Sequence, residues 1–445
     1  MTASGKFPAD FVCALFREAE LSISSDRVGP SGSAENLRES YTSEHTYRNT
    51  RLPVERAMTL IPDAYRTREF YDIEQERVWA HGWVCVGYTS QVRNAGETIV
   101  ARVANQPLFV TRNKAGELRA FFNVCRHRGS LLMTEDGQHD VIRCPYHCWG
   151  YNLDGKLLGT PYFKGLDVPP EEQAIFDTSE VKEFCKDDYG LLPVRVEAWG
   201  CFVYVNIDRE APPLRTWLGD LPQRYARFPL DELVLVHRRK LEINANWKLI
   251  AENFMEYYHL PWVHPELCNV SGFKDHHRYQ GPGMYTGMCT SPLTTSPATV
   301  RMDLPTMPGL NAVESNSAYW VWMFPNVAWF LLPNHLFTLL IHPDGNGRTV
   351  ECADLLVHPN VYEAENAQEQ IDGIFKFWDM VNGQDIGAVE RVYQGLQTKA
   401  FLGGRMCYHF EEPIHRFQNM VIDQMVGRFR VPPGDDQGER GVLTS

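Results

Sequence analysis

Short stretches in which apolar and polar residues alternate fill the first half of the chain, and they predict β-strands. The expected strands are residues 97–103, 107–112, 117–123 and 200–206. Before them, the spacing of apolar residues between positions 62 and 83 is typical of a helix. We therefore expect a helical lead-in and a small all-β domain, which together span residues 51–232.

A different pattern begins near residue 233, where strand-like stretches are mixed with helical ones. The expected strands are 234–243, 319–332, 335–342 and 350–357, and the expected helices are 247–260 and 364–396. Residues 268–315 are rich in Gly, Pro, Ser, Thr and Met, which predicts long loops. Residues 233–445 are therefore expected to form a larger α+β domain.

In the first fifty residues, the apolar positions show neither the strand period nor the helix period. They are rich in Ser, Arg and Glu, and they contain a Gly-Pro-Ser-Gly-Ser run at 29–33. This composition predicts a mobile tail over residues 1–50, with one short amphipathic turn at 11–16. Acidic residues within the tail argue against a transit peptide. We expect a cytoplasmic protein, with an organellar stroma as the alternative if the tail is a transit peptide.

Composition narrows the function. The chain has 445 residues, 44% of them hydrophobic, and a formal net charge of −13. A nucleic-acid partner is disfavoured because phosphate binding requires a basic surface. No run of apolar residues approaches the length of a membrane span, so no membrane association is expected. The eleven cysteines form no disulfide-like framework, which predicts free thiols in a reducing compartment.

Two of these cysteines stand out through their neighbours. Cys125-Arg126-His127 is followed, after sixteen residues, by Cys144-Pro145-Tyr146-His147. Two thiolates and two imidazoles suit a tetrahedral zinc site. They equally suit a [2Fe–2S] centre in which two histidines replace two cysteines on one iron. The spacing alone leaves both open.

A second set of metal-ligand residues lies in the 247–260 helix. Glu256 and His259 are three residues apart and so share a face of a continuous helix. Pro261 is expected to end that helix after His259, which lets His264 swing back toward the same point. Two imidazoles and one carboxylate can bind Fe(II) with positions left open for oxygen. The carboxylate candidates are Asp372, Asp379 and Asp385.

Taken together, these motifs resemble the large subunit of Rieske-type non-haem iron oxygenases, over about residues 50–430. The resemblance is carried by Cys-Arg-His-Arg-Gly…Cys-Pro-Tyr-His…Trp at 125–149 and by Asn246-Trp247-Lys248…Glu252-Asn253…Glu256…His259…His264. It implies a small Rieske domain, followed by a catalytic domain with an antiparallel sheet covered by helices. One departure is Cys148, where the family usually has glycine.

The resemblance also implies roles. Cys125 and Cys144 would hold one iron of the cluster, and His127 and His147 the other. His259, His264 and Asp385 would bind a mononuclear iron, with Asp379 as runner-up for the carboxylate. The family forms homotrimers in which an acid, here Glu256, bridges a cluster histidine and an iron-ligand histidine of adjacent subunits. Electrons would come from a separate NAD(P)H-dependent reductase, since no dinucleotide-binding glycine motif occurs here.

Glutamate at the bridging position resembles the family branch that acts on quaternary ammonium compounds such as choline, glycine betaine, carnitine and stachydrine. Aromatic residues are dense near the second site, and rings attract such cations. The candidate substrate residues are Tyr258, Trp262, Trp320, Trp322 and Phe324. On a strand of period two, the last three share one face. The expected reaction is hydroxylation or N-demethylation of a small quaternary ammonium compound.

Three alternatives stay open at this point. The first is hydroxylation or demethylation of an aromatic substrate. The second is a zinc-stabilised binding protein that uses the site at 125–147. The third is a Rieske protein that only carries electrons, for which residues 233–445 are unneeded.

Overall fold

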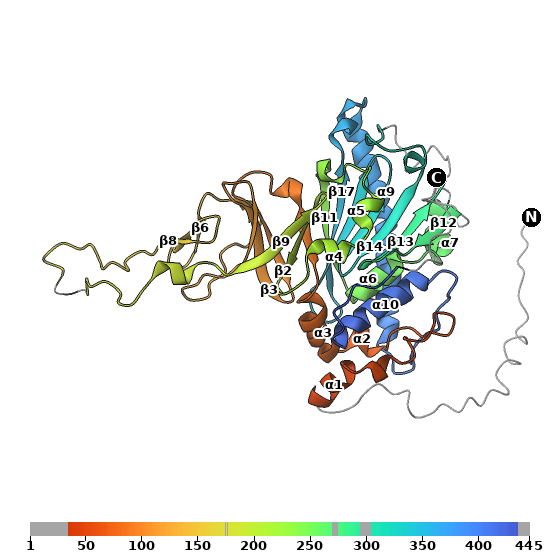
Figure 1. Cartoon of the computed structure of the whole chain (residues 1–445), viewed down its shortest axis with the longest axis horizontal. Helices are drawn as coiled ribbons and strands as arrows, with labels where there is room; N and C mark the ends of the chain where they lie inside the picture. Colours follow the sequence, from red (N-terminus) through yellow and green to blue (C-terminus); the bar gives the residue numbers. More distant parts are fainter. Residues whose placement is uncertain (1–33, 174, 176, 269–274, 294–303, 435–445) are drawn as a thin grey trace, which may run out of the picture.

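The computed structural model describes residues 34–173, 175, 177–268, 275–293 and 304–434. It contains two large antiparallel sheets and one small one, and helices pack mainly against the second large sheet (Figure 1). The α+β class, with a small β part followed by a helix-covered antiparallel sheet, is thereby confirmed.

The first sheet has the strand order β1-β10-β9-β4-β3-β2-β5. Its strands are β1 (Val84–Tyr88), β2 (Glu97–Val103), β3 (Gln106–Arg112), β4 (Leu118–Phe122), β5 (Gly137–Gln138), β9 (Pro193–Trp199) and β10 (Phe202–Asn206). A small sheet beside it consists of β6 (Ile142–Arg143), β7 (Gly150–Tyr151) and β8 (Leu157–Gly159). The predicted strands 97–103, 107–112, 117–123 and 200–206 correspond to β2, β3, β4 and β10, whereas β1, which is buried along its whole length, was not predicted.

The second sheet has the order β11-β17-β16-β15-β14-β13-β12. Its strands are β11 (Val234–Ile243), β12 (His276–Tyr279), β13 (Tyr285–Thr290), β14 (Ala318–Met323), β15 (Val327–Leu331), β16 (Leu336–Pro343) and β17 (Thr349–Val357). The prediction of long loops over 268–315 is wrong at β12 and β13. The predicted strand 319–332 is a hairpin, because Phe324-Pro325-Asn326 forms a turn between β14 and β15.

Helices of the N-terminal half are α1 (Ala34–Tyr41), α2 (Asp63–Arg66), α3 (Arg68–Glu74), α4 (Leu214–Leu218) and α5 (Leu221–Arg224). Those of the C-terminal half are α6 (Trp247–Phe254), α7 (Leu260–Val263), α8 (Pro265–Cys268), α9 (Ala367–Leu396) and α10 (Glu412–Met425). Among the described residues, no helix combines the length and the apolar character needed to cross a bilayer.

The predicted tail over residues 1–50 is wrong at its C-terminal end. Residues 34–41 form α1, and Tyr41 and Tyr47 are fully buried. The Tyr41 hydroxyl donates to Asp63 Oδ2 at 3.1 Å, which fastens this segment to α2. Residues 1–33, with the predicted turn at 11–16, lie outside the described residues.

One hydrophobic core runs through both large sheets. The side chain of Asn326 pairs with the backbone of Cys85, accepting from its N–H at 3.0 Å and donating to its carbonyl at 2.9 Å. Nearby, the buried Tyr88 hydroxyl donates to Asp354 on β17 at 2.8 Å. These hydrogen bonds give partners to buried polar groups that would otherwise lack them. They therefore fix how the two sheets pack against each other.

Candidate metal centres and substrate cavity

The two Cys–His segments form loops of the same shape. In each, the cysteine N–H donates to the carbonyl five residues later, at 2.8 Å in both loops. In each, the cysteine carbonyl accepts from the N–H four residues later, at 3.1 Å. The loops face one another, because the Cys125 and Cys144 thiols interact and the His127 and His147 ring centroids are 4.7 Å apart.

These four residues fit a cluster with two thiolate and two imidazole ligands. The Nδ1 atom of His127 is buried and has no hydrogen-bond partner within the described part of the chain, so it is available to a ligand. Although burial opposes ionisation, the N–H groups of His147 and Tyr146 keep the pKa of Cys144 below its usual value. Trp149 stacks on His127 at 4.8 Å and covers this side of the site.

The backbone geometry explains why glycine is favoured at the position of Cys148. The loop around Cys125 has Gly129 at the corresponding position, with φ of 74°, and Cys148 has φ of 56°. Both values lie in the left-handed region, which glycine adopts without a steric penalty. Cys148 therefore occupies a position that favours glycine, and its side chain is exposed.

The predicted helix over 247–260 ends early. Asn246 caps α6 by accepting from the Lys248 N–H at 3.1 Å, and the helix stops at Phe254. Glu256 is beyond that end, where its carboxylate accepts the N–H groups of Tyr258 and His259. Such side-chain bonds to the backbone compete with a helix. The expectation that Glu256 and His259 share a helix face, with a bend only after His259, is therefore wrong.

Pro261 starts a helix rather than ending one. It occupies the first turn of α7, where a missing N–H costs nothing. His264 follows as the residue at which α7 ends, with φ of −127° and ψ of 62°. This short helix brings His264 back toward His259, so that the ring centroids are 5.2 Å apart.

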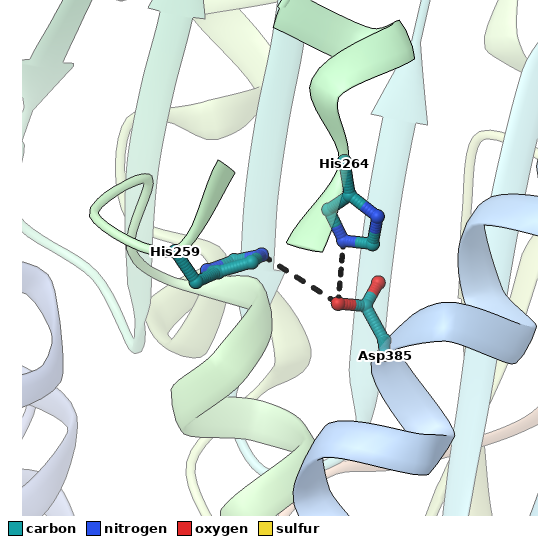
Figure 2. A group of neighbouring side chains, drawn as sticks. All are labelled: His259, His264 and Asp385. Atoms are coloured by element: carbon teal, nitrogen blue, oxygen red, sulfur yellow. Dashed lines mark hydrogen bonds and ion pairs between the residues drawn. The ribbon is translucent and has the colours of Figure 1, made fainter. Parts of the chain in front are cut away.

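His259, His264 and Asp385 converge from α7 and α9 (Figure 2). One potential ligand atom from each lies within 4.8 Å of the others. His264 Nε2 is 2.7 Å, and His259 Nε2 3.5 Å, from Asp385 Oδ1. Two imidazoles and one carboxylate in this arrangement fit a mononuclear iron centre with open coordination positions. We refer to these three residues as the facial triad.

Three further side chains orient the facial triad. Glu256 Oε1 lies 2.5 Å from His259 Nδ1, and Gln384 Oε1 lies 2.7 Å from His264 Nδ1. Asn253 Nδ2 donates to Asp385 Oδ1 at 2.6 Å. With its Nδ1 atom engaged, each imidazole presents Nε2 to the centre, the usual arrangement of a metal-binding histidine.

The two competing aspartates on α9 lie elsewhere. Asp379 pairs with Arg239 on β11, and Asp372 lies 2.8 Å from His237 Nε2. Neither belongs to the group of candidate ligands formed with His259 and His264. The geometry therefore favours Asp385 as the third ligand.

A cavity beside the facial triad, called the triad cavity below, is lined mainly by apolar side chains. Phe254, Trp320 and Phe330 contribute aromatic rings, and Glu351 contributes a carboxyl group. No lysine or arginine occurs among its lining residues in the described chain.

Of the five predicted substrate residues, only Trp320 lines this cavity. Trp322 is covered by Phe254 and Phe417, and Phe324, which follows the end of β14, packs on Phe417. Tyr258 and Trp262 are 49% and 82% exposed and lie outside the cavity lining. The period of a strand shows which residues share a face. It does not show which of those residues are covered by a neighbouring helix.

Sequence reasoning missed several residues at this site. Gln384 and Asn382 are ordinary polar residues of a long helix, and nothing in the pattern marks them. Glu351 carried a readable signal, because it is an acid within a stretch otherwise typical of a buried strand. Phe330 belonged to the dense aromatic region but could not be separated from the core residues around it.

Comparisons with known proteins agree with this arrangement. Residues 82–170 match the family described as Rieske [2Fe-2S] domain, and residues 230–427 match the ring hydroxylating alpha subunit (catalytic domain). Choline monooxygenase of Atriplex hortensis is 26% identical, over 82% of this chain and 78% of its own. The carnitine monooxygenase oxygenase subunit of Acinetobacter pittii is 28% identical, over 76% and 85%.

Solved structures share the fold. A quaternary ammonium Rieske monooxygenase superposes with a TM-score of 0.72 at 24% identity, over 86% of this chain and 98% of its own. Naphthalene 1,2-dioxygenase from Rhodococcus sp. gives 0.70 at 20%, over 88% and 99%. The two family matches imply a Rieske cluster and a mononuclear iron as cofactors, which the residues above can hold. A zinc-stabilised binding protein or a pure electron carrier is thereby disfavoured. The chain belongs to the Rieske-type non-haem iron oxygenases, as their large, alpha subunit.

Proposed function

We propose that this oxygenase hydroxylates a carbon next to the nitrogen of a small quaternary ammonium compound. Hydroxylation of an N-methyl group leads to demethylation, because the hydroxymethyl product releases formaldehyde. The observation that carries the proposal is the wall of the triad cavity, which combines aromatic rings with a carboxyl group and, among the described residues, contains no lysine or arginine.

Three of the aromatic rings pack against one another and form one wall of the cavity for a compact cation. The ring centroids of Phe254 and Phe330 are 4.9 Å apart, and those of Trp320 and Phe330 are 5.5 Å apart. The interplanar angles of 64° and 83° make these walls meet at a corner. Each ring face attracts a desolvated cation by about 0.5–2 kcal/mol. The relatives named for choline and carnitine support the same substrate class.

The residues of this chain position the reaction. When bound, the cluster supplies electrons and the mononuclear iron supplies oxygen activation. His259, His264 and Asp385 would hold the iron beside the triad cavity, and the apolar lining would exclude water from it. The same lining would confine the substrate carbon next to these three residues.

We also propose a homotrimer fed by a separate NAD(P)H-dependent reductase. In Figure 1, β6 and β8, which neighbour the two Cys–His loops, lie toward one end of the long axis of the molecule, and α7 lies toward the other end. This separation supports electron delivery from a neighbouring subunit. Tyr146, beside His147, and Trp262, beside the facial triad, are 59% and 82% exposed, as expected of residues at a subunit contact. Glu256 would then bridge His259 and His147 of the partner subunit.

A substrate panel tests the proposal. The purified protein is supplied with a reductase, NADH and oxygen, and then with quaternary ammonium and aromatic candidates. Formaldehyde and hydroxylated products are quantified together with oxygen consumption, so that uncoupled turnover is recognised. We expect product from at least one quaternary ammonium compound. Product from aromatic compounds alone would overturn the proposal in favour of an aromatic hydroxylase or demethylase.

A further inference from the structure

Glu351 is a buried acid in the wall of the triad cavity. It lies on β17 between Ile341 of β16 and Leu241 of β11, which are its partners across the sheet. Its side chain is fully buried, and it lines the same cavity as Asp385. An acid at such a position is unusual, because burying an unpaired carboxylate is strongly unfavourable.

Only half of this carboxyl group is satisfied. Asn382 Nδ2 donates to Glu351 Oε1 at 2.5 Å. The other oxygen, Oε2, is buried and accepts no hydrogen bond from any described residue. Leaving a buried polar atom without a partner costs about 1–3 kcal/mol. A group that binds in the cavity could remove this penalty.

Among the described residues of the sheet, no lysine or arginine pairs with the acid. Arg238, on the neighbouring strand, pairs with Asp354 at 2.7 and 2.8 Å. The pKa of Glu351 is raised to about 7, mainly by burial; the hydrogen bond from Asn382 opposes this rise, and the nearby Asp385, Asp354 and Asp379 contribute to it. A bound cation would have the opposite effect and favour the ionised form.

Glu351 is also placed correctly relative to the facial triad. Its partner Asn382 is three residues before Asp385 on α9, so the two lie on the same face of this helix. A cationic nitrogen beside Glu351 therefore keeps its carbon substituents close to the triad. The rings of Trp320 and Phe330 line the same space.

We infer that Glu351 is a specificity-determining residue, whose free Oε2 is the counter-charge for the quaternary nitrogen of the substrate. This inference rests on the proposed function and adds the residue that distinguishes a cation from a neutral molecule of equal shape. Asn382 is a positioning residue, because its bond to Oε1 fixes the orientation of the carboxyl group in the cavity wall.

Equilibrium binding to the oxygen-free holoenzyme tests the assignment without turnover. The cationic probes are choline and glycine betaine, and their neutral-headed carbon isosteres are 3,3-dimethylbutan-1-ol and 3,3-dimethylbutanoate. Glu351→Gln keeps the volume and the bond from Asn382 but removes the charge. Glu351→Asp keeps the charge. Glu314→Gln is the control, since Glu314 is a buried acid outside the cavity lining. The cluster spectrum and melting temperature verify folding of each variant.

In the wild type and in Glu314→Gln, we expect at least one cation to bind more tightly than its isostere. Glu351→Gln should weaken that cation by about tenfold or more and leave the isostere within about twofold. Glu351→Asp should retain a preference for the cation. Equal cation binding by the wild type and Glu351→Gln would overturn the role of Glu351 and leave the proposed function standing. A wild type that binds neither cation would overturn both.

Discussion

Asn253 Nδ2 donates a hydrogen bond to Asp385 Oδ1 at 2.6 Å, and this bond joins α6 to α9 at the facial triad. The same oxygen lies 2.7 Å from His264 Nε2. Asn253 therefore fixes the rotamer of the proposed carboxylate ligand across 132 positions of sequence. Groups that orient a metal ligand in this way govern how tightly the metal is held.

Replacing Asn253 with Ala should weaken iron binding by about 10–100-fold, the usual effect of losing such an orienting group. Competition with a chromogenic chelator measures this affinity. Asn244→Ala is the control, because Asn244 is an exposed residue shortly before α6 whose side chain donates to Glu390 of α9 at 3.2 Å, and it lies outside the facial triad. An unchanged affinity in Asn253→Ala would show that Asp385 is held by other contacts.

Glu256→Gln should reduce turnover by roughly tenfold or more while both metals stay bound. Glu256 contacts the Nδ1 atom of His259 and two backbone N–H groups, and glutamine preserves the shape of these contacts but not the charge. Iron analysis and the cluster spectrum detect any loss of metal, and single-turnover kinetics measure the slowed electron delivery. Undiminished electron delivery would count against the bridging role.

The buried ion pair between α3 and α6 gives a stability prediction. Lys248 Nζ lies 2.6 Å from Glu74 Oε1, and both side chains are fully buried. Burial raises the pKa of Glu74 and lowers that of Lys248, so each group depends on the other for its charge. Lys248→Met should destabilise the fold by about 3–5 kcal/mol, because it leaves the buried Glu74 carboxylate without its positively charged partner.

The double variant Glu74→Leu/Lys248→Met should recover much of this loss, since it removes both charges. Denaturant unfolding of the two single variants and the double variant forms the cycle. A double variant less stable than Lys248→Met would contradict the explanation.

Acid sensitivity should arise partly at His335. Burial lowers the pKa of His335 to about 3, and its Nε2 accepts from Trp378 Nε1 at 2.9 Å, so the folded protein holds it neutral. The unfolded chain takes up this proton below about pH 6.5, the ordinary histidine pKa. Stability from this group is therefore complete at neutral pH and falls as the pH drops from about 6.5 toward 3.

The contribution of His335 amounts to at most about 1.4 kcal/mol per pH unit over that window. His335→Gln does not titrate, so it should lose less of its melting temperature than the wild type between pH 7 and pH 5. The comparison uses the change with pH of each protein, not its absolute stability. Parallel curves would contradict the assignment.

The sequence predicted the structure well where the residues adjacent in sequence determine the local conformation. The predicted strands 97–103 and 234–243 match β2 and β11 at both ends, and the Cys125 and Cys144 motifs marked two loops that the structure brings together. β13 was missed because it lies in a stretch rich in Gly, Pro, Ser, Thr and Met, a composition that predicts loops. The end of α6 was missed because it depends on the Glu256 side chain, which turns back onto the backbone.

Other features arise only from the fold. The contacts of Asn253, Gln384 and Glu351 join segments more than thirty positions apart, so no local spacing predicts them. The same holds for the exposed Trp262 and the covered Trp322, whose surroundings are set by the helices that pack nearby. Aromatic density identified the correct region but only one of its lining residues, Trp320.

We propose that one chain holds a two-iron cluster and a separate iron bound by His259, His264 and Asp385. Iron analysis combined with EPR of Asp385→Ala, with Asp379→Ala as the control, tests it most directly. We expect Asp385→Ala to lose the mononuclear iron and all turnover while its reduced cluster signal is intact, and Asp379→Ala to retain both metals. Full iron content in Asp385→Ala, or selective loss of the mononuclear iron in Asp379→Ala, would show that Asp385 is not the carboxylate ligand.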